Sequence, residues 1–168
     1  MKKNIIFIII LLLILITSAI IILTKNKPIK GFTITSIKYF SFGESGGFSM
    51  YNGTSYKIEY KDNKYITTIL PSKTPDENKI ETEISKSEVD KVIDVLNKNN
   101  VSKWDGFDKS DNDVLDGNSF SLSLTTQDDK KIEAHGYMKW PENYSKVESE
   151  LDDIFMDIFI KNGGKQGE

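Results

Sequence analysis

The chain has 168 residues, and five of its 22 basic residues lie in residues 1–30, so residues 31–168 carry 17 basic against 25 acidic side chains, a net charge of −8. A domain that is this acidic and has no arginine is a poor binder of nucleic acid or of an anionic lipid surface, because both need a cationic stripe. The absence of cysteine excludes disulfides, zinc–thiolate sites, lipid-modified cysteines and thiol nucleophiles.

The first predicted element is a membrane anchor. Residues 5–23 form an almost unbroken apolar run of 19 residues, and a helix of that length nearly spans a hydrocarbon core of ~30 Å. A cleaved signal peptide usually has a shorter apolar stretch, of ~7–15 residues, that ends at small residues. Here Ala19 lies inside the run and is followed by more isoleucine. We therefore expect a single uncleaved signal-anchor helix in residues 1–24.

The rest of the chain is predicted to form one domain. Residues 25–31 are polar and contain Pro28 and Gly31, which is typical of a stalk. The domain is expected to span residues 32–162 and to lie outside the cytoplasm, although lysines on both sides of the anchor give little charge bias to set its orientation. Residues 163–168 are expected to be a flexible tail.

Strands are predicted from composition and from alternation of apolar and polar residues. The clearest pair is a hairpin in which Tyr56, Ile58 and Tyr60 share one face and the turn lies at Asp62-Asn63. The same signals predict strands at residues 32–42, 48–55, 65–70, 80–84, 119–124 and 132–138.

Two amphipathic helices are predicted between and after these strands. Ser85 and Glu88 have the spacing of a capping box, which starts the first helix. Pro141 suits the first position of the second helix, whose buried stripe begins at Tyr144, and we expect Trp140 to pack there as well. The predicted fold class is therefore α+β, an antiparallel sheet of about 5–7 strands with two helices packed on one face, preceded by the single transmembrane helix.

An aspartate-rich loop is the candidate metal site. Oxygen ligands at this density suit Ca²⁺ or Mg²⁺, but the spacing is not that of an EF-hand, because Asp116 stands where the loop needs glycine. The alternative is a solvated loop, since Asp and Asn are common in turns. Otherwise no cofactor is expected. The candidate ligands are Asp105, Asp108, Asp111, Asp113 and Asp116.

The only histidine, His135, is predicted to project from the polar face of a strand. Glu133 lies on the same face, and Ser121 or Ser123 could lie across the hairpin. A catalytic role would need a nucleophile or an oriented acid beside the imidazole, and no motif provides that geometry. The alternative is an ordinary surface residue.

Large aromatic residues are numerous for a domain of this size, and an exposed subset could contact a peptide or a glycan. They are Tyr51, Tyr56, Tyr60, Tyr65, Trp104, Phe107, Tyr137 and Trp140.

The second half of the domain carries a recurring pattern. WDGF (104–107) is followed by LDGNSFSL (115–122) and by IEAHGYMKWPENY (132–144), and the last of these leads into an amphipathic helix. This pattern, over about residues 101–160, resembles a group of uncharacterised bacterial membrane-anchored or lipoprotein domains. The resemblance implies an extracytoplasmic domain without assigned catalytic residues. It also implies structural roles for Asp116, Gly117, Gly136, Trp140 and Pro141.

Three functions follow as hypotheses. The first is a single-pass, membrane-anchored domain that acts outside the cytoplasm as an interaction or ligand-binding module, with a protein or glycan partner. The second is a metal-assisted or hydrolytic enzyme that uses the loop 105–116 and His135. The third is a structural or regulatory partner of another membrane protein.

Overall fold

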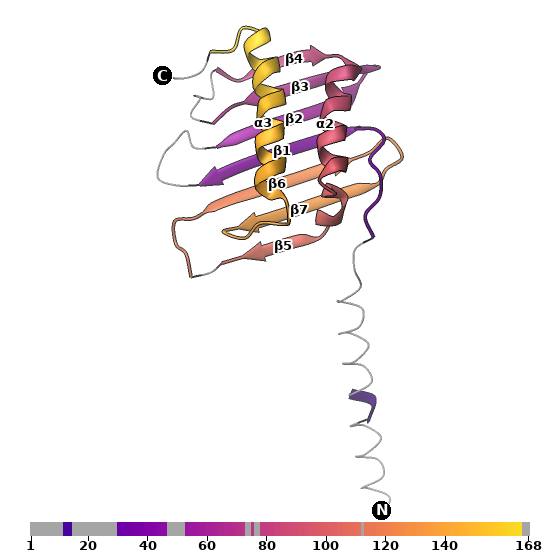
Figure 1. Ribbon diagram of the computed structural model, residues 1–168, viewed down its shortest axis with the longest axis vertical. Helices are drawn as coiled ribbons and strands as arrows, with labels where there is room; N and C mark the ends of the chain where they lie inside the picture. Colours follow the sequence, from indigo (N-terminus) through magenta and orange to yellow (C-terminus); the bar gives the residue numbers. More distant parts are fainter. Residues whose placement is uncertain are drawn as a thin grey trace, which may run out of the picture. The chain divides into compact units, whose positions relative to one another are not determined.

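The computed structural model describes residues 12–14, 30–46, 53–72, 75, 78–111 and 113–165. Contacts divide the chain into two units, Met1–Lys30 and Gly31–Glu168. Of the first unit, Leu12–Ile14 are helical and Lys30 is the other described residue. The second unit contains all the strands and the two long helices described below (Figure 1).

The described residues of the second unit form a seven-stranded sheet in the order β4-β3-β2-β1-β6-β7-β5. The central strand β1 (Tyr39–Gly46) pairs on one side with the meander β2 (Thr54–Lys61), β3 (Lys64–Leu70) and β4 (Ile80–Ile84). On its other side lies the hairpin of β6 (Asn118–Thr125) and β7 (Lys131–Tyr137), and the short strand β5 (Phe107–Ser110) forms the edge. The predicted turn is confirmed, since Asp62 and Asn63 have φ of 50° and 61°.

The predicted antiparallel sheet is wrong at its edge, because β5 runs parallel to β7 and the sheet is mixed. The cause is the path of the chain. β5 and β6 run in opposite directions, and β7 returns to lie between them. A strand that lies antiparallel to β6 in that position is necessarily parallel to β5.

The predicted transmembrane helix is likewise no part of the described fold. None of the helices that the described residues form is long and apolar enough to cross a membrane. Apart from Leu12–Ile14, the apolar run 5–23 lies outside the described residues. The fold class is therefore corrected to a mixed sheet with helices on one face.

Both long helices, α2 (Lys86–Lys98) and α3 (Tyr144–Lys161), lie across the same face of the sheet (Figure 1). That face supplies the apolar half of each strand. Phe155 of α3 stacks on Tyr56 of β2, with ring centroids 4.4 Å apart, and on Phe40 of β1 at 6.2 Å. The fully buried large side chains of this layer are Ile34, Ile37, Phe40, Phe42, Tyr56, Ile58, Ile69, Leu96, Phe120, Leu122, Phe155 and Phe159.

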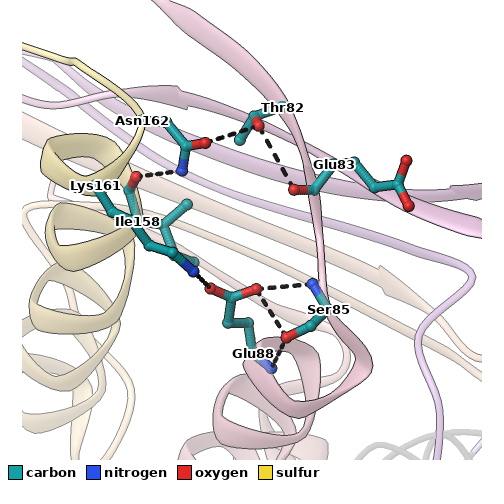
Figure 2. Close-up of polar contacts among 7 residues, drawn as sticks. All are labelled: Thr82, Glu83, Ser85, Glu88, Ile158, Lys161 and Asn162. Carbon is teal, nitrogen blue, oxygen red and sulfur yellow. Dashed lines mark hydrogen bonds and ion pairs between the residues drawn. The ribbon is translucent and has the colours of Figure 1, made fainter.

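Helix α2 begins at the predicted capping box, which is confirmed and is drawn in Figure 2. The Glu88 backbone N–H donates to Ser85 Oγ at 3.2 Å, and Glu88 Oε2 accepts from the Ser85 backbone N–H at 2.7 Å. Lys161, at the end of α3, adds an ion pair of 3.0 Å to Glu88 Oε1. The cap therefore also joins the start of α2 to the end of α3.

Replacing Ser85 by alanine is expected to lower the free energy of unfolding by about 1 kcal/mol, because the Glu88 N–H loses its acceptor. Denaturant unfolding, followed by tryptophan fluorescence, measures the change. Ser87→Ala is the matched control, because Ser87 is exposed in the same helical turn and forms no cap. Equal unfolding midpoints for the two variants would contradict a capping role for Ser85.

Helix α3 begins three residues later than predicted. Pro141 is buried and precedes a turn, and Asn143 adopts a left-handed conformation with φ of 62°, so regular helix starts at Tyr144. The predicted buried stripe of α3 is confirmed from Tyr144 to Ile158. At the other end, the Gly164 N–H donates to the Phe159 carbonyl at 2.9 Å, and residues 166–168 of the predicted tail lie outside the described residues.

The chain enters the domain along α2 rather than as the strand predicted for residues 32–42. Asn97 of α2 accepts from the Ile34 N–H and donates to the Ile34 carbonyl, both at 2.8 Å. The Phe32 N–H donates to Ser102 Oγ at 3.0 Å. Side chains therefore take the backbone bonds of Phe32 and Ile34. The first backbone bonds to the neighbouring strands are those of Lys38, and β1 starts at Tyr39.

Candidate functional site

The aspartates of the predicted metal site do not converge on one point, because the first three are spread along the length of β7. Asp105 Oδ1 accepts from the Glu133 backbone N–H at 3.0 Å, and Asp108 lies on β5. Asp111 forms an ion pair of 2.7 Å with Lys139, which lowers the pKa of Asp111. Among the described residues, no group of three or more His, Asp or Glu side chains could hold a metal ion. Binding of Ca²⁺ or Mg²⁺ here stays a prediction.

The loop between β5 and β6 is held by Tyr137 at the end of β7. The Tyr137 hydroxyl donates to the Val114 carbonyl at 2.9 Å and accepts from the Gly117 N–H at 2.8 Å. The Asp111 N–H donates to the Tyr137 carbonyl at 2.9 Å. These contacts wrap the loop around the strand end, and they give Gly117 a structural role, since a Cβ there would lie 2.3 Å from the Met138 side chain.

His135 lies on the uncovered face of the sheet, as predicted, in a row with two other polar side chains. Ser121 of β6 is its register partner on one side, and Asp108 of β5 is its partner on the other. His135 Nδ1 is 3.5 Å from Asp108 Oδ1, and the two side chains are 53% and 84% exposed. No hydrogen bond joins Ser121 to the imidazole among the described residues. The row has the residue types of a catalytic triad but lacks the link between nucleophile and base.

A second polar site lies on the helix-covered face, where the sequence did not indicate one. It is a pocket of about 340 Å³ beside the first turn of α3, which we call the Trp140 pocket. Its walls come from β1, β6, the residue Ser72 and the segment that leads into α3. The lining residues are Glu44, Ser45, Gly46, Ser72, Asn118, Trp140, Tyr144, Ser145 and Glu148.

One wall of the Trp140 pocket is aromatic. The Trp140 ring stacks on Tyr144, with centroids 4.8 Å apart and planes inclined by 23°. Tyr144 is buried and rests on Phe120 and Trp104, at 4.7 Å and 6.0 Å. The predicted packing of Trp140 at the helix start is therefore confirmed, although its ring stays 40% exposed. The buried tryptophan is Trp104, which is 3% exposed. Trp140 is therefore an exposed ring on a rigid aromatic base.

The other wall carries Glu44 and Glu148, and tyrosine hydroxyls hold Glu44 and the nearby Asp152. Glu44 continues the inward face of β1, and its carboxylate accepts from the Tyr144 hydroxyl. Asp152, eight residues further along α3, accepts from the Tyr56 hydroxyl. Burial raises the pKa of both tyrosines well above the usual range, and the carboxylate beside each ring raises it further. Both tyrosines therefore stay protonated and act as donors.

Glu148 lies between these two hydrogen-bonded pairs. Burial and the neighbouring Glu44 raise the pKa of Glu148 to about 6, and Asp152 adds to the effect. None of the ion pairs among the described residues involves Glu44, Glu148 or Asp152. The Trp140 pocket therefore combines an exposed aromatic ring with half-buried carboxyl groups that form no ion pair with any lysine of the described residues.

This arrangement predicts a stability that depends on pH. The pKa of Glu148 is about 6 in the folded protein and about 4.5 in the unfolded chain. Its favourable contribution to stability is therefore fully present below pH 4.5 and is lost as the pH rises through 6. Glu148→Gln should leave the unfolding midpoint unchanged at pH 4 and raise it at pH 7.5, in urea denaturation.

The matched control is Asp153→Asn, at an exposed carboxylate of the same helix. The difference in unfolding midpoint between Asp153→Asn and the parent protein should be the same at pH 4 and at pH 7.5. A Glu148→Gln midpoint that stays equal to the parent's at both pH values would contradict the raised pKa.

No protein-family model matches the chain, and no curated protein matches it. The resemblance of residues 101–160 to bacterial membrane-anchored or lipoprotein domains stays a prediction.

Sequence reasoning missed the Trp140 pocket, although part of its signal was present. Tyr144, Glu148 and Asp152 recur every four residues, so they share one side of a helix next to the buried stripe. Their partner Glu44 lies 100 residues away from Tyr144 and is brought to them by the pairing of β1 with β6. The spacing on the helix could be read from the sequence, whereas the second half of the pocket could not.

Proposed function

We propose that residues 31–165 form an interaction or ligand-binding module that acts outside the cytoplasm at the cell membrane. Its ligand binds in the Trp140 pocket. The observation that carries the proposal is the exposed Trp140 ring beside oriented polar groups. Binding sites for small ligands and for side chains of partners combine apolar contact area with a few fixed polar groups, and this pocket provides both.

The rigidity of the pocket supports binding. Trp140 and Tyr144 rest on Phe120, and the Tyr144 hydroxyl orients Glu44. Side chains that are already ordered lose less conformational freedom when a ligand arrives, which favours affinity.

One observation favours binding over hydrolysis. On the other face of the sheet, Ser121 lacks a hydrogen bond to His135. We therefore place the enzymatic alternative second.

The proposed location at the membrane rests on the apolar run of residues 5–23. The full chain should fractionate with membranes, and external protease added to intact cells freed of their wall should remove the domain. A domain that stays protected, or a chain that appears only in the soluble fraction, would contradict this location.

The binding proposal is tested by titrating the full chain with defined probes while tryptophan emission is recorded. Suitable probes are neutral chitin oligosaccharides and glycine-flanked peptides that contain one lysine, glutamate or phenylalanine. A ligand should change the emission of the parent protein, and Trp140→Ala should remove both the change and the calorimetric heat of binding. His135→Ala, on the opposite face, is the control and should bind like the parent. A probe that binds Trp140→Ala as tightly as the parent, or a panel without any binder, would contradict the proposal.

A further inference from the structure

We propose that the Trp140 pocket receives a lysine or arginine side chain of a partner protein. The aliphatic part of that side chain lies along the Trp140 ring, and its positive charge lies between Glu44 and Glu148. This inference rests on the proposed function, since it names the ligand chemistry of the same pocket.

The first support is the charge of the pocket. Elsewhere on the domain, carboxylates of comparable burial have lysine partners. Glu59 contacts Lys57 and Lys61, and Glu150 contacts Lys98. Within the described part of the chain, the ion pairs leave out both carboxyl groups that line the Trp140 pocket, Glu44 and Glu148. A cation bound in the pocket would pair with these carboxyl groups and would relieve the repulsion between Glu44 and Glu148.

The second support is independent of charge and comes from the exposed ring. Trp140 is 40% exposed, and its ring lines the same pocket as Glu44 and Glu148. Lysine and arginine side chains bury an apolar stem against such a ring while the charged end reaches polar groups. A cation that lies over tryptophan gains a further attraction to the ring. An acidic sugar or an acidic peptide would use the ring but would be repelled by the carboxylates.

The third support is the net charge of the whole domain, which favours a basic partner. Residues 31–168 carry a net charge of −8, which raises the rate of encounter with a basic protein surface and not with a neutral glycan. A basic protein segment therefore fits both the pocket and the surface around it.

The protonation of the pocket makes this binding depend on pH. The groups that surround Glu148 are Glu44 from β1, Tyr56 from β2, and Tyr144 and Asp152 from α3. Both tyrosines keep their protons, and the pKa of Glu148 is about 6. A cation is bound best when Glu148 is ionised. Below pH 6, binding of the cation therefore releases a proton from the Glu44–Glu148 pair. The affinity for lysine, whose own charge is constant in this range, should increase as the pH rises from 5 to 7.5.

The test compares two peptides on the full chain, acetyl-Gly-Lys-Gly-amide and the same peptide with Nε-acetyl-lysine. Acetylation removes the charge and keeps the aliphatic stem, so the second peptide is the matched control. We expect the lysine peptide to bind at least tenfold more tightly than the acetylated one at pH 7.5, and to lose about tenfold in affinity at pH 5. Glu148→Gln should weaken the binding of the lysine peptide by about tenfold and should remove its dependence on pH, while Asp153→Asn should bind like the parent.

The outcomes separate this inference from the proposed function. Equal affinity for the two peptides, or an affinity for lysine that does not change with pH, overturns the inference. A chitin oligosaccharide that binds in a Trp140-dependent manner where the lysine peptide does not also overturns it, yet leaves the Trp140 pocket as a binding site. If no probe gives Trp140-dependent binding, the proposed function fails as well. Near-native emission from the buried Trp104 confirms that each variant is folded.

Discussion

Trp104→Ala is expected to lower the free energy of unfolding by about 3–5 kcal/mol, the range for removing a large buried aromatic side chain. Trp104 is 3% exposed and packs on Phe120 and Tyr144, with centroids 6.1 Å and 6.0 Å away. Its indole N–H donates to the Glu142 carbonyl at 3.1 Å, in the turn that leads to α3. The substitution therefore leaves a cavity under the Trp140 pocket and an unpaired carbonyl at its edge.

Trp140→Ala is the variant for comparison, because the Trp140 ring is 40% exposed. Its removal mainly takes away contacts with Tyr144 and Phe120. We expect it to cost about 1 kcal/mol, less than half the cost of Trp104→Ala. Urea denaturation followed by circular dichroism compares the two variants without depending on tryptophan emission. A larger loss for Trp140→Ala than for Trp104→Ala would show that Trp140 is a core residue and not an exposed wall of the pocket.

Asn97→Ala is expected to lower the free energy of unfolding by about 2–4 kcal/mol. Its amide satisfies both backbone groups of Ile34, each at 2.8 Å, and the alanine variant leaves an N–H and a carbonyl without partners in a half-buried place. Each unsatisfied group costs about 1–3 kcal/mol. Ile34 is 1% exposed, so its backbone gains little compensation from water unless the segment also leaves the core.

Urea denaturation measures this loss, and amide hydrogen exchange at Ile34 reports on the segment itself. Lys98→Ala is the matched control in the same turn of α2. It removes an ion pair to Glu150 in which the lysine is 59% exposed, and such pairs contribute about 0–1 kcal/mol. Equal costs for Asn97→Ala and Lys98→Ala would show that the segment before β1 is held by its apolar side chains alone.

Local signals in the sequence were enough to predict the elements that depend on neighbouring residues. The capping box of Ser85 and Glu88, the turn at Asp62-Asn63 and the alternation in β6 and β7 each involve residues a few positions apart. The interactions that form them lie within each segment, since caps, turns and strand faces depend on local hydrogen bonds and on side-chain direction.

The elements that were missed depend on residues far apart in the chain. β5 is four residues long and carries one apolar residue, Phe107, so alternation gave no signal, and only its pairing with β7 makes it a strand. The two tryptophans have similar local surroundings and both contact Tyr144 and Phe120, yet Trp104 is 3% exposed and Trp140 is 40% exposed. The Trp140 pocket needs Glu44 from the other half of the chain. Tertiary context decided each of these, as it does for burial in general.

The attachment of residues 31–38 has a mechanical consequence. This segment leads directly into β1, the central strand of the sheet, which pairs with β2 on one side and β6 on the other. Tension applied to the chain before Gly31 would first load the Ser102 and Asn97 bonds to Phe32 and Ile34 and would then pull β1 along its own axis. The bonds of β1 to β2 and β6 would have to shear together, whereas an edge strand such as β4 could be peeled off one bond at a time. A force that arrives from the N-terminal side of the domain therefore acts on the central strand of the sheet and not on one of its edges.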